Sequence, residues 1–284
     1  IVDGYNSLDP LDKDIKVDIG SQSAADSSII LNKGSTVEGD VFVAGNVDSA
    51  IKDLGATVTG DKFVSAPQPL PPVTAPVLPD KGAITATGQT VKITPADSGT
   101  YSEIYLRQLV DKKAKTTTPS VLEVSGGEVV LHMTGDIQLE NSCEIHIGPN
   151  ATLTIYTDGN IHCRNGSGIN TENPPEKAET LQIYATGPDG QFIDIKAKSD
   201  FTGVIYAPDA DVVLYAKGNA YGSIVADSFN YMAGGNFYYD EALMQKNTVD
   251  DEGVQFVVAR WSESAPSFDS RTVLAEPEVV EPLK

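Results

Sequence analysis

The chain has 284 residues, and its 40 acidic side chains outnumber 20 lysines and arginines, which gives a formal net charge of −20. A surface this acidic repels phosphate groups, so nucleic acid is not expected as a partner. No stretch comes near the roughly 20 apolar residues that a membrane-spanning helix requires. We therefore expect contact with a membrane only through an anchor that would precede Ile1.

The first clear repeat lies between residues 36 and 66. The segment Thr36-Val-Glu-Gly-Asp-Val-Phe-Val-Ala-Gly45 recurs twenty-one residues later as Thr57-Val-Thr-Gly-Asp-Lys-Phe-Val-Ser-Ala66. The pairs Gly39-Asp40 and Gly60-Asp61 are expected at corners, because glycine tolerates positive φ and aspartate bonds its own nearby amides. The repeat predicts two adjacent rungs of a stacked β structure.

Residues 67–80 are rich in proline. Proline removes amide donors and favours an extended, semi-rigid chain, so this segment is not expected to form a central rung. Two interpretations are open: a linker between two lobes, or a strap along the outside of one continuous stack.

Two further pairs mark the middle of the chain. The motif Gly135-Asp-Ile137 returns as Gly159-Asn-Ile161, twenty-four residues later, and predicts another stacked corner. Cys143 and Cys163 lie twenty residues apart, about one turn of such a stack, which makes them candidates for a disulfide between rungs. The alternative is two buried free thiols. The only basic cluster, residues 112–115, is expected to be a solvated loop.

The strongest repeat lies between Phe201 and Leu243. Gly203-Val-Ile-Tyr-Ala207 recurs nineteen residues later as Gly222-Ser-Ile-Val-Ala226, and each copy is a short β run. A repeat this short cannot bury an apolar face alone, so its copies are expected to stack, with Ile205 against Ile224. The aromatic residues at 231 and 237–239 are expected to cap the end of the stack.

These repeats predict an all-β chain that folds as a right-handed parallel β-helix, or β-solenoid. We expect one solenoid domain over residues 1–245, with the proline-rich strap at 67–80, followed by an acidic C-terminal extension at 246–284. Rung length varies from nineteen to twenty-four residues because corner loops differ while the stacked strands do not.

No catalytic, cofactor-binding or metal site is expected. The spacings of His132, His146 and His162 fit no compact zinc pattern, although His162 with Cys163 and Cys143 is an alternative N/S site. No nucleophile has an evident base.

The alternative to a non-enzymatic role is a carbohydrate-active or carbohydrate-binding β-helix, similar to polysaccharide lyases. Such proteins place carboxylates on an exposed strand face, and Asp194, Asp209 and Asp211 are the candidates here. Their sequence context, a turn and an alternating strand, is equally that of ordinary outward-facing residues.

Three segments resemble the C-terminal β-solenoid domain of bacterial PilX-like type IV pilus-assembly proteins. They are Gly203-Val-Ile-Tyr-Ala-Pro-Asp-Ala-Asp-Val212, Gly222-Ser-Ile-Val-Ala226 and Tyr239-Asp-Glu-Ala-Leu243. The Gly-Asp rungs are also similar to those of bactofilin-like polymers. The PilX-like pattern has histidine where this chain has Tyr238. The resemblance implies an envelope or surface protein and carries over no catalytic residue.

We therefore expect a structural or adhesive component of the bacterial cell surface, located outside the cytoplasm and associated with type IV pili or a surface filament. Its expected partners are copies of itself or other envelope proteins.

Overall fold

The computed structural model describes residues 1–9, 15–68, 70–175, 177–232 and 235–245. The C-terminal extension predicted at 246–284 lies outside these residues. The described chain is all-β, with only two single-turn helices, α1 (Val47–Ala50) and α2 (Ala242–Gln245), and two 3₁₀ turns, η1 (Pro95–Asp97) and η2 (Ala178–Thr180). Neither helix approaches the length and apolarity that crossing a bilayer requires.

Fourteen strands form one large sheet in which every pairing is parallel. From one end to the other they are β9 (Asp80–Thr87), β11 (Gly99–Arg107), β15 (Glu128–Met133) with β16 (Ile137–Leu139), β18 (Thr152–Thr157) with β19 (Ile161–Cys163), β21 (Leu181–Ala185) with β22 (Gln191–Ala197), β23 (Phe201–Ala216), β24 (Ala220–Tyr231), β25 (Phe237–Asp240), β1 (Val2–Tyr5), β4 (Thr36–Val37) and β7 (Thr57–Val58).

Smaller sheets form the other sides of the stack. One contains β10 (Thr90–Ile93), β14 (Val121–Val124), β17 (Glu144–Ile147) and β20 (Gly168–Thr171); another contains β2 (Ile19–Ser21), β5 (Val41–Val43) and β8 (Lys62–Val64); a third contains β3 (Ile29–Leu31) and β6 (Ile51–Asp53). These pairings are parallel too. Among the described strands, only β12 (Leu109–Asp111) and β13 (Thr116–Thr118) pair in the antiparallel sense.

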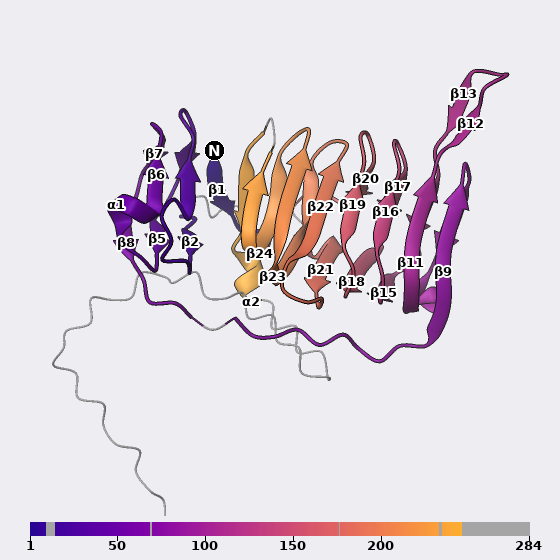
Figure 1. Ribbon diagram of the computed structural model, residues 1–284, viewed down its shortest axis with the longest axis horizontal. Coiled ribbons are helices and arrows are strands. Elements are labelled where there is room, and N and C mark those ends of the chain that lie inside the picture. The colour runs from indigo at the N-terminus through magenta and orange to yellow at the C-terminus, as the bar shows by residue number, and fades with distance from the viewer. Residues whose placement is uncertain (10–14, 69, 176, 233–234, 246–284) are drawn as a thin grey trace, which may run out of the picture.

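Some strands, such as β11 and β23, continue through a corner that interrupts the strand in neighbouring levels. The first half of β11 pairs with β15 and its second half with β16. In the same way, β23 pairs with β21 near its start and with β22 near its end. Each pass of the chain therefore contributes strands to several sheets, and successive passes lie one on another (Figure 1).

The repeats of the sequence occupy equivalent positions in this stack. Gly203 pairs with Gly222 and Ile205 with Ile224, as the nineteen-residue repeat predicts. The other two repeats pair as well, through Thr36 with Thr57 and Ile137 with Ile161.

The spatial order of the levels differs from their order in the chain. Strand β1 lies between β25 and β4, so the N-terminal levels are added to the end at which the C-terminal levels finish (Figure 1). The prediction that the aromatic residues of β25 cap the stack is therefore wrong, because β25 is covered on one side by β24 and on the other by β1. The backbone groups that a cap would have to cover are instead paired with the start of the chain.

The proline-rich segment is a strap along the outside of the stack rather than a linker between lobes (Figure 1). It must connect the level of β8 with β9 at the opposite end. The large sheet has eleven levels from one end to the other. The ten spacings between them, at about 4.8 Å each, give a span of about 48 Å. From Val64 to Asp80 the chain advances sixteen residues, which cover about 50 Å in the polyproline II conformation at about 3.1 Å per residue. The strap has almost no slack.

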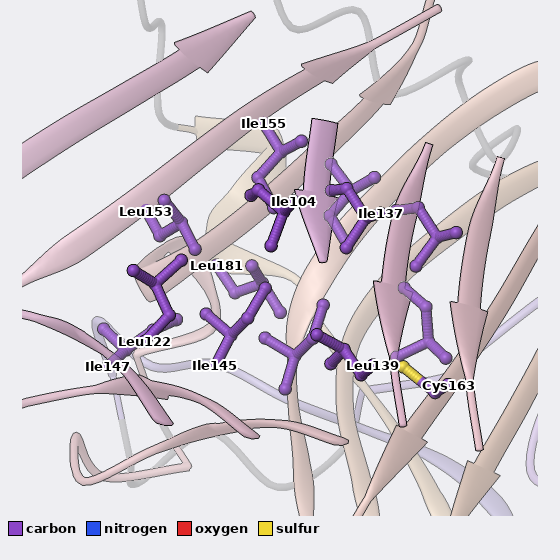
Figure 2. Close-up of a cluster of buried hydrophobic side chains, with 14 of the residues drawn as sticks. Ile104, Leu122, Ile137, Leu139, Ile145, Ile147, Leu153, Ile155, Cys163 and Leu181 are labelled. Carbon is purple, nitrogen blue, oxygen red and sulfur yellow. The ribbon is translucent and has the colours of Figure 1, made fainter. Parts of the chain in front are cut away.

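The core is a set of aliphatic columns between the sheets. Ile104, Ile137, Ile161 and Ile193 follow one another in register, and each is fully buried. Figure 2 shows how side chains from the large sheet and from the β10–β14–β17–β20 sheet meet in this core. Stacking like side chains fills the interior level by level, so each level is stabilised by its neighbours.

Candidate functional surfaces

Aspartate and asparagine side chains join successive levels at three corners. The side-chain oxygen of each accepts the backbone N–H of the residue stacked above it: Asp40 accepts from Asp61 at 2.7 Å, Asp136 from Asn160 at 2.9 Å, and Asp200 from Asn219 at 2.9 Å. The same hydrogen bond links further levels. The side chain of Asp18 accepts the Asp40 amide, that of Asn160 accepts the Phe192 amide, and that of Asn219 accepts the Asn236 amide. We call these series the Asx ladders.

The ladders correct the expected role of the Gly-Asp pairs. Asp40 does not bond its own nearby amide but an amide one level away, and so it fixes the register between rungs. Burial raises the pKa of Asp18 above its usual value, and the neighbouring Asp40 charge adds to that effect while the hydrogen bond from the Asp40 amide opposes it.

The corner glycines are required by close packing. None of Gly39, Gly60, Gly135 and Gly159 has positive φ, so the expectation of positive φ at Gly39 and Gly60 is wrong. A Cβ on Gly60 would overlap Asp40 and Gly39, and a Cβ on Gly159 would overlap the backbone of Gly135. Gly222 is different, because it combines φ of +131° with a backbone contact to Gly203 that leaves no room for a Cβ.

The two cysteines are free thiols, so the predicted disulfide between Cys143 and Cys163 is wrong. The physical reason is the local repeat length: Cys163 pairs with Leu139, twenty-four residues earlier, rather than with a residue twenty positions away. Cys143 lies at the next corner, where its sulfur accepts the Ser120 amide at 3.4 Å. Both side chains are buried, which is the alternative that the sequence left open.

Desolvation disfavours the thiolate form of both cysteines. Burial raises the pKa of Cys163 to about 12, and it raises the pKa of Cys143 as well. The adjacent His162 points to the opposite face of β19, where its ring lies 5.9 Å from that of Phe192. The alternative site of His162 with the two cysteines is therefore wrong. No cluster of three or more His, Cys, Asp or Glu side chains in the described chain is arranged to hold a metal ion.

The other two histidines belong to hydrogen-bonded networks on the outside of the stack. His146 lies 3.3 Å from a Glu144 oxygen and 3.0 Å from a Glu172 oxygen, and Lys198 approaches the second Glu144 oxygen at 2.5 Å. His132 lies 3.2 Å from Asp158, whose other oxygen accepts the Thr186 hydroxyl at 2.6 Å. These carboxylates are occupied by neighbours from other levels, so the networks tie strands together.

The three aspartates considered for carbohydrate chemistry do not share partners. Asp194 is held by Lys196 at 2.7 Å, and Asp211 accepts a hydrogen bond from Ser228. In the register of β22 and β23, Asp194 lies opposite Val213 and Asp211 opposite Phe192. Asp209 is exposed beside the Pro208 turn. Asp194 and Asp211 therefore lie on adjacent strands, offset by two residues, and each side chain already has a partner.

A tyrosine column underlies the strap. Tyr156 and Tyr184 stack with ring centroids 4.9 Å apart, and Tyr206 follows in the next level. Leu70, Val73 and Ala75 of the strap pack on this column, and the Tyr206 hydroxyl donates to the Pro71 carbonyl at 2.7 Å. Burial beneath the strap raises the pKa of Tyr206 to about 12. This face of the large sheet is consequently covered.

Two kinds of surface stay open to partners. The first is the pair of end strands, since β9 pairs only with β11, and β7 only with β4, within the described part of the chain. The second is the β12–β13 hairpin, which pairs with no other described strand and projects from the stack (Figure 1). Unpaired strand edges are sites at which another chain can add.

Sequence reasoning found the repeats but missed the ladders. Their signal is a Gly-Asp or Gly-Asn dipeptide before a β run, at Gly39-Asp40, Gly60-Asp61, Gly135-Asp136, Gly159-Asn160, Gly218-Asn219 and Gly235-Asn236. Each has a glycine position without room for a side chain, and in all but Gly60-Asp61, which lies in the last level, the following side chain accepts an N–H from the next level.

The parallel levels and their ladders define an all-β protein built from stacked strand repeats. Residues 31–246 match the model of a protein family described as Domain of unknown function (DUF7305), and the chain belongs to this family. No curated protein matches the chain. Among solved structures, an ice-binding protein from the Antarctic ascomycete Antarctomyces psychrotrophicus is similar over 78% of this chain and 90% of its own, with 16% sequence identity and a TM-score of 0.22.

Proposed function

We propose that the chain is a non-enzymatic structural or adhesive component of the bacterial cell surface, associated with type IV pili or a surface filament. The observation that carries this proposal is the single long stack, held by backbone pairing from level to level, in which the end strands β9 and β7 each pair with only one other described strand. A stack of this kind is a stiff rod whose length is set by the number of levels. It suits a protein that spaces or joins others.

The finer architecture belongs to the same proposal: a right-handed parallel β-helix. Its support is the sequence of parallel pairings between passes of the chain, with Ile205 on Ile224 at its centre. Crossover connections between parallel strands of one sheet are right-handed in about 98% of cases, because of strand twist. The PilX-like motifs described above support the surface location.

Surface location is tested on intact cells that make the protein. Antibody against the described domain should label unpermeabilised cells, and external protease should remove the label. Labelling only after permeabilisation, with the protein in the cytoplasmic fraction, would contradict the proposal.

The non-enzymatic part is tested separately with purified protein. We expect no release of reducing or unsaturated sugar ends from acidic polysaccharides, with or without calcium. Cleavage that disappears in Asp194→Asn or Asp211→Asn would replace the structural role with the carbohydrate-active one.

A further inference from the structure

The β12–β13 hairpin, residues 109–118, is an addition that the stack does not need. At the same corner in other levels the connection is short. It has two residues, Gly88–Gln89, between β9 and β10, and four residues both between β16 and β17 (140–143) and between β19 and β20 (164–167). Between β11 and β14 it takes thirteen residues, 108–120. The corner is closed below the hairpin, because the buried Ser120 hydroxyl donates to the Arg107 carbonyl at 2.7 Å. We call residues 109–118 the arm.

The arm is exposed along its whole length and carries an unusual charge for this chain. All six residues of its strands are exposed, and Leu109 and Val110 each have 51% of their surface accessible. Its turn holds Lys112, Lys113 and Lys115, none of which forms an ion pair with a described residue. With Asp111 included, the arm has a net charge of +2 and leaves −22 on the rest of the chain.

The turn has an ordered shape. The Asp111 carboxylate accepts the amides of Lys113 and Ala114 at 2.8 and 2.9 Å, and these bonds lower the pKa of Asp111. Lys115 adopts φ of +54°, which completes the turn. An isolated two-stranded hairpin is only marginally stable in water, so one that exposes apolar residues gains most when a partner covers it.

We propose that the arm docks on the acidic body of a second copy of this chain. Charge complementarity selects this occupant: an arm of net charge +2 meets a second chain whose residues outside the arm carry a net charge of −22, and opposite fields steer and orient association. Leu109 and Val110 then lose their exposure to water. The arm leaves the stack at β11, one level from the free β9 edge, so docking brings the second copy to the open end of the stack. This inference rests on the surface-filament role proposed above and names its partner.

The test compares the full chain with an arm-free variant in which residues 109–118 are replaced by Asn-Gly, which leaves a four-residue corner between Arg107 and Ser120. Sedimentation should show the full chain self-associating at low salt and dissociating as salt is raised, because the Debye length shortens. The arm-free variant should stay monomeric while it keeps the circular dichroism and urea midpoint of the full chain.

Charge reversal separates the lysines from the rest of the arm. The variant Lys112→Glu/Lys113→Glu should weaken self-association by about tenfold or more, since it turns attraction into repulsion. The matched control Lys177→Glu/Lys217→Glu alters the net charge equally at two exposed lysines elsewhere in the stack and should leave association unchanged.

Three results would overturn the inference. They are a full chain that stays monomeric at every salt concentration, an arm-free variant that associates as the full chain does, and arm-dependent binding to phosphatidylserine vesicles without self-association. If the arm-free variant associates as the full chain does, the structural role can still hold through another interface. Surface labelling of cells tests that role independently of all three results.

Discussion

At the scale of single residues, the fold depends on positions where one atom more or less decides whether two levels can approach. Gly222 is the most constrained of these. A Cβ there would overlap the Gly203 carbonyl oxygen, and φ of +131° is unfavourable for any other residue.

We expect Gly222→Ala to lower the free energy of unfolding by about 2–4 kcal/mol, since steric overlap adds to backbone strain. The control is Gly190→Ala, where φ is +82° but nothing lies within 4 Å of the added Cβ. That variant should lose about 1 kcal/mol, from φ alone. Urea denaturation measures both, and equal losses would show that the close approach of the levels is not what constrains Gly222.

Asn219 tests the Asx ladders. Its side chain accepts the Asn236 amide at 2.9 Å and donates to the Tyr221 hydroxyl at 3.2 Å. Asn219→Ala should cost about 1–3 kcal/mol of stability, because the partly buried amide loses its acceptor. Asn219→Asp keeps the acceptor and should lose less than half as much. If Asn219→Ala were as stable as the unchanged protein, the Asx ladders would not contribute to stability.

The thiols make a prediction about reactivity. Because burial holds the pKa of Cys163 near 12 and raises that of Cys143, both stay protonated as pH rises through the physiological range. Iodoacetamide at pH 8 should leave the native protein unmodified. Mass spectrometry after denaturation without reductant should show both cysteines alkylated, whereas two unreactive cysteines there would restore the disulfide.

At the scale of elements, the extended conformation expected of the proline-rich strap matches the distance that it has to span. Its reach of about 50 Å barely exceeds the span of about 48 Å, so its length is set by the number of levels. Shortening it should therefore strain the molecule, and lengthening it should not.

Deleting Thr74 and Ala75 removes about 6 Å of reach and should lower the urea midpoint clearly, with new protease cleavage in the strap. The matched control inserts Gly-Ser between the same two residues. It adds slack, which costs only a few tenths of a kcal/mol of loop entropy. A deletion variant as stable as the insertion variant would contradict a taut strap.

The strands that pair over one repeat length were predictable from the sequence, because copies such as 203–207 and 222–226 share their spacing of small and β-branched residues. The absence of a disulfide between Cys143 and Cys163 was not predictable, since repeat length varies along the chain and only the local value decides which residues pair. The choice between linker and strap needed the span of the whole stack, which no single segment encodes.

At the scale of the whole molecule, the N-terminal strand β1 covers the edge of β25 and continues the stack. Strand β1 pairs with β25 in register, from Val2 with Phe237 to Tyr5 with Asp240. The nitrogen of Ile1, just before β1, donates to the Asn236 side chain at 3.0 Å. No repeat connects these two segments, so periodicity could not place them together. The result is one continuous sheet in which the first levels of the chain are added to the last.

The pairing of β1 with β25 determines which strand edges another chain could reach. Because β1 covers β25, the remaining free edges are those of β7 and β9 among the described strands. The arm leaves the stack beside the β9 edge, so the proposed docking of a second copy would take place at that end.

The most direct test of this stacking order is a disulfide between strands β1 and β25. Asp3 and Tyr238 are paired neighbours on the outside of β1 and β25, and parallel neighbours about 4.8 Å apart allow a disulfide. Asp3→Cys/Tyr238→Cys should oxidise completely within one molecule. The control Asp3→Cys/Tyr221→Cys spans two strand spacings, about 10 Å, and should stay reduced. A reduced first pair, or equal oxidation of both, would contradict the stacking of the N-terminal levels on the C-terminal strand.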